Sequence, residues 1–277
     1  MEWLEHINSA LSYIDDNLDG EVSIKKAAQL ACCSTYHFQR MFSYIIGIPL
    51  SEYLRRRRLT MAAFDLQNGD KVIDVALRYG YDSPTAFNRA FQTIHGISPS
   101  VAQKSDAVLK AFPPVSLQIA VKGISEINYR IVEKEGFRVV GIRKKIDEEP
   151  DENDIITFNL WEESEKESLL KPIIELINGE PTCLMGLFVE DDSDGNDYCY
   201  ICGVTDKPVP EGMYEVNVPA YTWAIFSGDD EPSLIHRIYS EWWQTAGYEF
   251  AANIEIEVYL DYLNDAKIEI WIPVVKK

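Results

Sequence analysis

One stretch near the start of the chain is repeated 49 positions later. Nine of its positions recur unchanged at this single offset, namely Ile24, Ala27, Ser34, Phe38, Arg40, Phe42, Gly47, Ile48 and Ser51 with Ile73, Ala76, Ser83, Phe87, Arg89, Phe91, Gly96, Ile97 and Ser100. A fixed period of this kind predicts one supersecondary unit used twice. Each copy is a short and a longer amphipathic segment joined by a turn, so we expect two helix-turn-helix units.

Helix start and stop signals outline these segments. Ser34 and Ser83 are N-cap residues for the second helix of each unit, and Gly47 and Gly96 end the same two helices. Apolar residues at three- and four-residue steps mark the buried side of each segment. We expect helices at about 3–18, 24–31, 35–46, 50–67, 72–79 and 84–95. This part of the chain is therefore predicted to be helical throughout.

The second helix of each unit begins with polar residues that the apolar side does not require. They are Tyr36, Gln39 and Arg40 in the first unit and Thr85, Asn88 and Arg89 in the second. We expect these turns to point outward, where Gln and Asn can bond adenine edges and Arg can bond guanine edges. For any single residue, a solvated helix face is the simpler explanation. Two such faces in repeated frames instead indicate contact with double-stranded DNA.

Charge is distributed unevenly along the chain. The net charge of −19, taken alone, argues against a nucleic-acid partner. Residues 1–110 are neutral overall, however, and residues 111–277 carry the whole excess of acid. Residues 25–58 hold seven Lys or Arg and one Glu, including the run Arg55-Arg56-Arg57-Arg58. This local basic footprint favours DNA binding by the first half and a different partner for the second.

Residues 5–105 resemble the DNA-binding domain of the AraC/XylS regulator family. The motifs that carry the resemblance are Ser34-Thr-Tyr-His-Phe38-Gln-Arg40-Met-Phe42, Tyr53-Leu-Arg55…Arg58-Leu and Tyr79-Gly80-Tyr-Asp-Ser83…Phe87-Asn-Arg89-Ala-Phe91…Gly96-Ile-Ser-Pro99. The resemblance implies that two recognition helices enter successive major-groove segments on one face of DNA. The family's contact positions fall on Tyr36, Gln39, Arg40, Pro84, Thr85, Asn88 and Arg89. By the habit of the family, we expect an activator that contacts RNA polymerase.

The second half has the composition of strands interrupted by two helices. We expect strands within 128–145, 182–189, 198–205, 214–226, 254–260 and 268–274, and helices at 155–170 and 231–246. The order strand, helix, strand, strand occurs twice, and the pairs Phe158/Trp161 and Tyr239/Trp242 occupy matching places 81 residues apart. Such a duplication predicts an α+β domain with one antiparallel sheet, both helices on one face, and a concave site at the seam between the copies.

Acidic residues alternate with apolar ones in the last two strands. Glu255, Glu257 and Tyr259 share one face by alternation, and Glu269 and Trp271 share a face of the partner strand. Carboxylates among aromatic rings suit a small cationic or amphipathic effector. The alternative is a sheet whose acidic face is simply wet, and the residues alone do not decide. If Glu257 faces an effector, we expect the helices to cover the opposite face, where Val258 points; the alternative is that the helix-covered face is the one that bears Glu257.

The second half resembles the GyrI-like effector-binding family. The motifs are Ile238-Tyr-Ser-Glu-Trp242-Trp…Ala246-Gly-Tyr248, Glu255-Ile-Glu257-Val-Tyr259 and Ile268-Glu269-Ile-Trp271-Ile-Pro273-Val. In relatives that bind lipophilic cations, a buried Glu on the penultimate strand is central. The resemblance places it at Glu257, framed by Trp242, Tyr259, Glu269 and Trp271. The whole chain then resembles Rob-type regulators, with a DNA-binding domain at 1–108, a linker at 109–125 and a GyrI-like domain at 126–277.

Catalytic functions fit the sequence less well. The four histidines are scattered and no Ser-His-Asp or Cys-His constellation is visible, so we expect no catalytic residues, no metal and no cofactor. The alternative is a GyrI-like domain that hydrolyses small molecules, with Glu257 as base or nucleophile, or that only sequesters drugs.

Two other motifs could in principle bind a metal, but each has a simpler explanation. Cys199-Tyr-Ile-Cys202 lies in an apolar run, which favours structural cysteines over a metal or redox site. Residues 190–197 favour a solvated acidic turn over a Ca²⁺ site because they lack EF-hand spacing.

No apolar run reaches the length of a membrane span, and the N-terminus lacks signal-peptide features. We expect a cytoplasmic, nucleoid-associated protein that binds no membrane.

Overall fold

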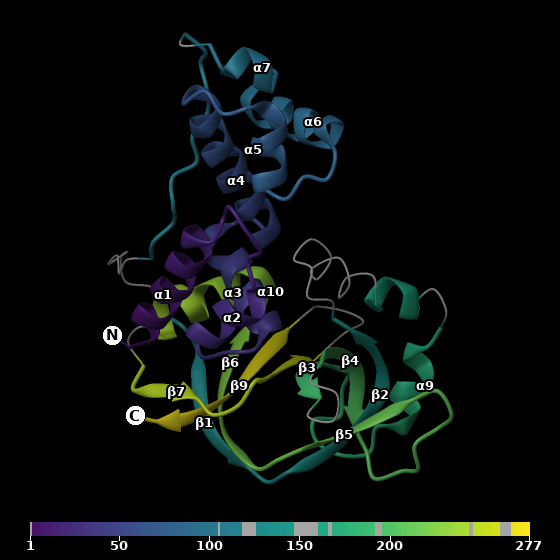
Figure 1. Ribbon diagram of the computed structural model, residues 1–277. Helices are drawn as coiled ribbons and strands as arrows, with labels where there is room; N and C mark the ends of the chain where they lie inside the picture. Colours follow the sequence, from purple (N-terminus) through teal and green to yellow (C-terminus); the bar gives the residue numbers. More distant parts are fainter. Residues whose placement is uncertain are drawn as a thin grey trace. The chain divides into compact units, whose positions relative to one another are not determined.

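The computed structural model describes residues 2–104, 106–117, 126–146, 160–165, 168–191, 196–243, 246–260 and 267–277. These residues form two compact units (Figure 1). The first unit comprises Met1–Cys32 and Ile48–Gln118, and the second comprises Cys33–Gly47 and Ile119–Lys277. In the described part of the chain, no helix is both long and apolar enough to cross a membrane.

The first unit is built from helices. They are α1 (Glu2–Asp16), α2 (Ile24–Leu30), α4 (Leu50–Gln67), α5 (Val72–Arg78), α6 (Pro84–His95) and α7 (Pro99–Ala102). The intervening helix, α3 (Thr35–Ile46), belongs to the second unit. The helices predicted from caps and apolar steps are confirmed, with boundaries shifted by a residue or two, and α7 is an addition.

The repeat produces two helices of the same design, α3 and α6. Both have 12 residues, and the hydroxyls of Ser34 and Ser83 each accept a hydrogen bond from the backbone N–H three residues later. Gly47 and Gly96 end them with φ angles of 78° and 77°, in the left-handed region that glycine adopts without steric cost. The repeated residues therefore fix both ends of both helices.

The arginine run on α4 is divided between core and surface. Arg57 is buried, and its guanidinium donates to Asp15 Oδ1 and to the carbonyl oxygen of Phe112, each at 2.6 Å. Arg55 and Arg56 pair with Glu52 on their own helix. Arg57 therefore stabilises the fold of the first unit and is not part of a basic surface.

The second unit is built on a nine-stranded antiparallel sheet. Its strands are β1 (Tyr129–Lys134), β2 (Phe137–Lys145), β3 (Met185–Asp191), β4 (Asn196–Val204), β5 (Tyr214–Val218), β6 (Tyr221–Gly228), β7 (Tyr248–Phe250), β8 (Ile254–Tyr259) and β9 (Ile268–Lys276). Their order is β1-β6-β9-β8-β3-β4-β2-β5, and β7 pairs with β9 (Figure 1).

The sheet order contains the predicted duplication. The triplet β6-β9-β8 is matched by β2-β4-β3, and the two triplets meet where β3 pairs with β8, which we call the seam. The second copy's helix is α10 (Glu231–Arg237), continued by a π-helical turn, η1 (Ile238–Trp242). The first copy's helices are residues 160–165 and α9 (Leu170–Leu176). Residues 155–159 and 166–167 of the predicted helix, with Phe158, lie outside the described residues.

Two of the predicted strands each consist of two strands. The segment 128–145 divides at Gly136 into β1 and β2, which pair near opposite ends of the sheet. A side chain at Gly136 would meet the carbonyl oxygen of Val218 at 3.0 Å, so glycine permits this crossing. The segment 214–226 divides at Pro219, which has no N–H to continue a ladder. The three-residue β7 was not predicted.

The helices cover the face of the sheet that carries Phe188. This ring packs with Leu160 and Ile173 of the covering helices. Glu255 is paired with Phe188 across the seam and therefore points to the same helix-covered face, whereas Val258 belongs to the aromatic core on the opposite face. The expectation that the helices cover Val258 is wrong, because alternation shows which residues share a face but not which face is covered.

Candidate functional site

The predicted recognition helix α6 presents an exposed polar face. Thr85 and Arg89 are exposed and Asn88 is half-buried. On the other side of the helix, Phe87 and Phe91 are fully buried in the core of the first unit. The arrangement is the one expected of a helix that offers hydrogen-bonding groups to base edges.

The other predicted recognition helix, α3, has the same length and caps as α6, but its polar residues are buried. Its residues Tyr36, Gln39 and Arg40 are only 6%, 4% and 5% exposed. The expectation that these turns point outward is wrong for this helix. Within the second unit, α3 packs on the helix-covered face beside the seam, and the caps that define a helix do not reveal what covers its polar side.

Carboxylates enclose the guanidinium of Arg40. Its Nη2 atom binds Glu257 Oε1 and lies 2.8 Å from Glu231 Oε1, and its Nε atom lies 3.7 Å from Glu255 Oε1. The side chains of Glu255 and Glu257 are each 3% exposed, and Glu231, at the start of α10, is partly exposed. One cation therefore faces three acids at a site from which water is largely excluded.

Aromatic rings complete this enclosure. The Tyr36 ring stacks on Phe188 with centroids 4.6 Å apart and planes inclined by 12°. The guanidinium carbon of Arg40 lies 4.8 Å from the Phe188 centroid and 5.6 Å from that of Tyr44. Arg40 Nη1 also donates to the Tyr36 hydroxyl at 2.8 Å. Negative charge and π faces together are the features that attract an organic cation.

The seam determines where these carboxylates lie. Glu255 and Glu257 are two positions apart on β8, so both point to the helix-covered face. Across the seam they are paired with Phe188 and Gly186. A side chain at Gly186 would meet Glu257 Oε2 at 3.1 Å, so glycine leaves room for this carboxylate. Tyr259 donates its hydroxyl proton to the same oxygen at 2.6 Å.

The two buried carboxylates differ electrostatically. Burial raises the pKa of Glu255, but Arg40 and hydrogen bonds from His37 and Tyr239 outweigh burial and lower it to about 2. The Tyr239 hydroxyl donates to Glu255 Oε2 at 2.9 Å, and His37 Nδ1 lies 3.4 Å from that oxygen. For Glu257, burial raises the pKa and Arg40 offsets it only in part. The pKa of Glu255 is therefore lowered and that of Glu257 is raised, so Glu255 is the more acidic of the two buried carboxylates.

The predicted effector residues divide between the two faces of the sheet. Glu257 and Tyr259 lie together at the site, as the sequence suggested. Glu269 is paired with Val258 across β8 and β9 and so lies on the opposite face, where Trp271 Nε1 donates to its Oε2 atom at 2.9 Å. The predicted grouping of Glu269 and Trp271 with Glu257 is therefore wrong.

Trp242 packs against rings of β6 and β1, and in the sheet β9 lies between these strands and β8, which carries Glu255 and Glu257. Its ring contacts Phe226 with centroids 4.8 Å apart and Tyr129 with centroids 5.3 Å apart. The position that matters on the same turn is Tyr239, which occupies a matching place in the duplicated unit but was not selected. Phe188 was also missed, because a buried strand residue gives no signal of its partner across a seam.

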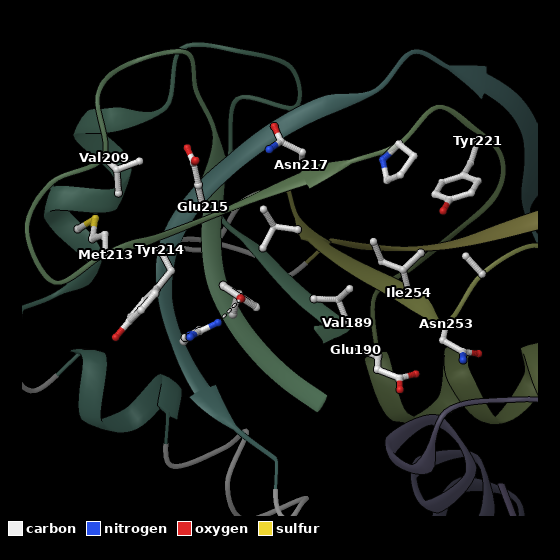
Figure 2. Close-up of a pocket in the computed structure, with 15 residues that line it drawn as sticks. Val189, Glu190, Val209, Met213, Tyr214, Glu215, Asn217, Tyr221, Asn253 and Ile254 are labelled. Atoms are coloured by element: carbon white, nitrogen blue, oxygen red, sulfur yellow. Dashed lines mark hydrogen bonds between the residues drawn. The ribbon is translucent and has the colours of Figure 1, made fainter. Parts of the chain in front are cut away.

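A separate cavity of about 820 Å³ opens beside the aromatic core on the opposite face of the sheet (Figure 2). In its wall, the guanidinium carbon of Arg143 lies 4.2 Å from the Tyr214 centroid, and Arg143 donates to the Tyr200 hydroxyl at 3.2 Å. Its two acids, Glu190 and Glu215, are not buried. None of the predicted site residues is among the described residues that line it. The acids of this cavity are therefore more exposed to solvent than Glu255 and Glu257 at the seam.

The cysteines and other metal-binding residue types are distributed as follows. Among the described residues, no three His, Cys, Asp or Glu side chains are grouped as metal ligands. Cys199 and Cys202 are buried, and burial raises the pKa of both thiols, which leaves them protonated and poorly reactive. Residues 192–195, the centre of the acidic turn, lie outside the described residues.

Comparison with known proteins identifies both halves of the chain. The family described as a helix-turn-helix domain matches residues 27–105, and that described as an integron-associated effector binding protein matches residues 130–274, just over half of the chain. The HTH-type transcriptional activator AarP of Providencia stuartii is 43% identical over 101 residues, which are 36% of this chain and 75% of AarP. The multiple antibiotic resistance protein MarA of Escherichia coli (strain K12) is 33% identical over 94 residues, 34% of this chain and 74% of MarA.

The sheet domain also has solved counterparts. The structure of SAV2435 bound to tetraphenylphosphonium covers 53% of this chain and 94% of its own, with a TM-score of 0.46 and 17% identity. The helix-turn-helix match contains the second copy of the repeat and all of the first copy from Ala27 onward, and the effector-binding match contains the carboxylates at the seam. The helix-turn-helix match is shared with a transcriptional activator, and the second match is to an effector-binding family. The chain belongs to the AraC-type DNA-binding transcription regulators that carry a C-terminal integron-associated, GyrI-like effector-binding domain.

Proposed function

We propose that this regulator activates transcription in response to a lipophilic organic cation that binds at the seam. The observation that carries the proposal is the buried pair Glu255 and Glu257, bordered by the rings of Phe188, Tyr239 and Tyr259. Buried carboxylates are costly without a positive partner, so this pair favours a cation at the position that the Arg40 guanidinium holds here. Rings around it add stacking and cation–π attraction for a flat or aromatic ligand.

The proposed DNA-binding domain is residues 1–108, followed by a linker at 109–125 and the effector domain at 126–277. The proposed base-reading residues are Tyr36, Gln39 and Arg40 on α3 and Thr85, Asn88 and Arg89 on α6. Two recognition helices per chain are compatible with binding by a monomer. AarP is named as a transcriptional activator, which supports activation here, and contact with RNA polymerase would accompany it. Such a function places the chain in the cytoplasm, at the nucleoid.

The experiment begins with recovery of the genomic DNA that the full chain binds. Affinity for a recovered duplex is then measured at several salt concentrations. We expect its logarithm to fall linearly with the logarithm of salt concentration, because phosphate contacts release counterions. Calorimetry with tetraphenylphosphonium measures the cation site, and tetraphenylborate, of the same shape and opposite charge, is the control that should not bind.

The possible failures of this experiment have different meanings. A folded chain that binds tetraphenylphosphonium but no genomic DNA would be a sequestering module. A chain that binds DNA but neither this cation nor a smaller aromatic cation would require a different class of effector. Equal binding of the phosphonium and the borate would remove the role assigned to the carboxylates.

A further inference from the structure

α3 is held at the seam by polar contacts along its whole length. At its start, the backbone N–H of Tyr36 donates to Asp197 Oδ2 at 3.2 Å. At its end, His236 Nδ1 donates to the carbonyl oxygen of Tyr44 at 2.7 Å. Between them, Arg40 enters the carboxylate site, and the cavity remaining beside the helix is only about 10 Å³, roughly the space of one water. The described groove is thus filled by the chain itself.

This occupancy removes the DNA-reading groups of α3 from solvent. Arg40 is 5% exposed, whereas its repeat equivalent Arg89 is exposed. Because both helices have the same length, serine N-cap and glycine terminator, the helix design does not explain the contrast. The sheet does, since Glu257 and Phe188 hold Arg40 away from any base edge.

The fit of Arg40 is incomplete, which leaves room for a competitor. Arg40 Nε and Glu255 Oε1 are both buried, and neither has a hydrogen-bond partner in the described part of the chain. The two atoms face each other at 3.7 Å, too far for a hydrogen bond, and buried polar atoms without a hydrogen bond are costly. A single guanidinium also leaves the three acids in excess. A cation that satisfies the carboxylates and still stacks on the rings therefore has a basis for displacing α3.

We propose that α3 is the internal ligand of the effector site: Arg40 occupies the cation position until an effector displaces it, and the displaced helix becomes free to read DNA. The inference rests on the proposed function, because effector and Arg40 use the same carboxylates. It adds that cation binding and burial of α3 exclude each other. The effector then raises DNA affinity by removing a competing contact within the chain.

The experiment is hydrogen exchange of the full chain with and without saturating tetraphenylphosphonium. We expect the backbone amides of α3 to exchange about tenfold faster or more with the cation, since the contacts that bury the helix are lost. The equivalent amides of α6 are the internal control, and tetraphenylborate is the ligand control. Binding of the cation with unchanged exchange in α3 would overturn this inference and leave the proposed function intact.

A second measurement compares cation affinity among variants. Arg40→Ala removes the internal ligand, so tetraphenylphosphonium should bind about tenfold more tightly than to the wild-type chain. Arg78→Ala is the matched control, because Arg78 also pairs with two acids, Asp65 and Asp70, but on the surface of the first unit. Weaker or equal binding by Arg40→Ala contradicts the inference. If Arg40→Ala does not fold, the exchange experiment on the wild-type chain decides. Absence of cation binding in both forms overturns the proposed function as well.

Discussion

Glu257→Gln is expected to weaken tetraphenylphosphonium binding by about 2 kcal/mol or more, roughly thirtyfold. The carboxylate is buried, so little solvent screens its attraction for a cation. The amide keeps the shape of the side chain and still offers an acceptor to the Tyr259 hydroxyl. Calorimetry measures the loss, and a neutral aromatic ligand should bind the variant as it binds the wild-type chain.

Glu269→Gln is the matched control for this prediction. It makes the same change on the neighbouring strand, but Glu269 lies on the opposite face and is paired with Arg130 at 2.9 Å. We expect its cation affinity to equal that of the wild-type chain. A loss in Glu269→Gln without one in Glu257→Gln would place the effector site on the opposite face, where the cavity of Figure 2 opens.

Arg89→Ala is expected to weaken binding to the recovered operator by about 1–3 kcal/mol, because an exposed arginine on α6 can bond a guanine edge with two hydrogen bonds. Discrimination should relax at one base position and persist elsewhere. Arg89→Lys keeps the charge but loses the planar fork, so it should recover affinity on all sequences without recovering that discrimination. Competition binding on a set of single-base operator variants measures both effects.

A uniform loss on every operator variant would contradict this assignment. Arg89 would then contact phosphate, and the slope of affinity against salt would become shallower in Arg89→Ala. Helix stability is not expected to change, since Phe87 and Phe91 anchor α6 from its other side.

The helices could be predicted because their determinants are local. Ser34 and Ser83 start two helices, Gly47 and Gly96 end them, and each signal acts within one turn of its helix. The order strand, helix, strand, strand also occurs twice in the sequence, and it predicted the duplication that the sheet shows as two matching triplets of strands. The strand boundary at Gly136 was missed because it depends on a contact with Val218, which is 82 positions further along the chain.

The site could be predicted only in part. Glu257 and Tyr259 were found because alternation along one strand is a local property. Glu269 was grouped with them wrongly. The face that Glu269 occupies depends on its pairing with Val258, and the sequence of the two strands does not determine this register. Cross-strand register must come from the fold.

Arg40 illustrates the remaining difficulty. Its guanidinium can bind a guanine edge or a carboxylate equally well. The sequence showed only that Arg40 occupies the position on α3 that Arg89 occupies on α6. The acid that binds it is 217 positions away, so no local pattern connects the two. A prediction based on spacing therefore gave Arg40 a DNA contact and left its contact with Glu257 unseen.

The affinity of the full chain for its recovered operator, measured with and without saturating tetraphenylphosphonium at one salt concentration, tests the account most directly. If a cation at the seam releases α3 for DNA, the operator should bind about tenfold more tightly in its presence, a coupling of about 1.4 kcal/mol, and tetraphenylborate should have no effect. Operator affinity that stays the same or falls when the cation is bound would contradict the account.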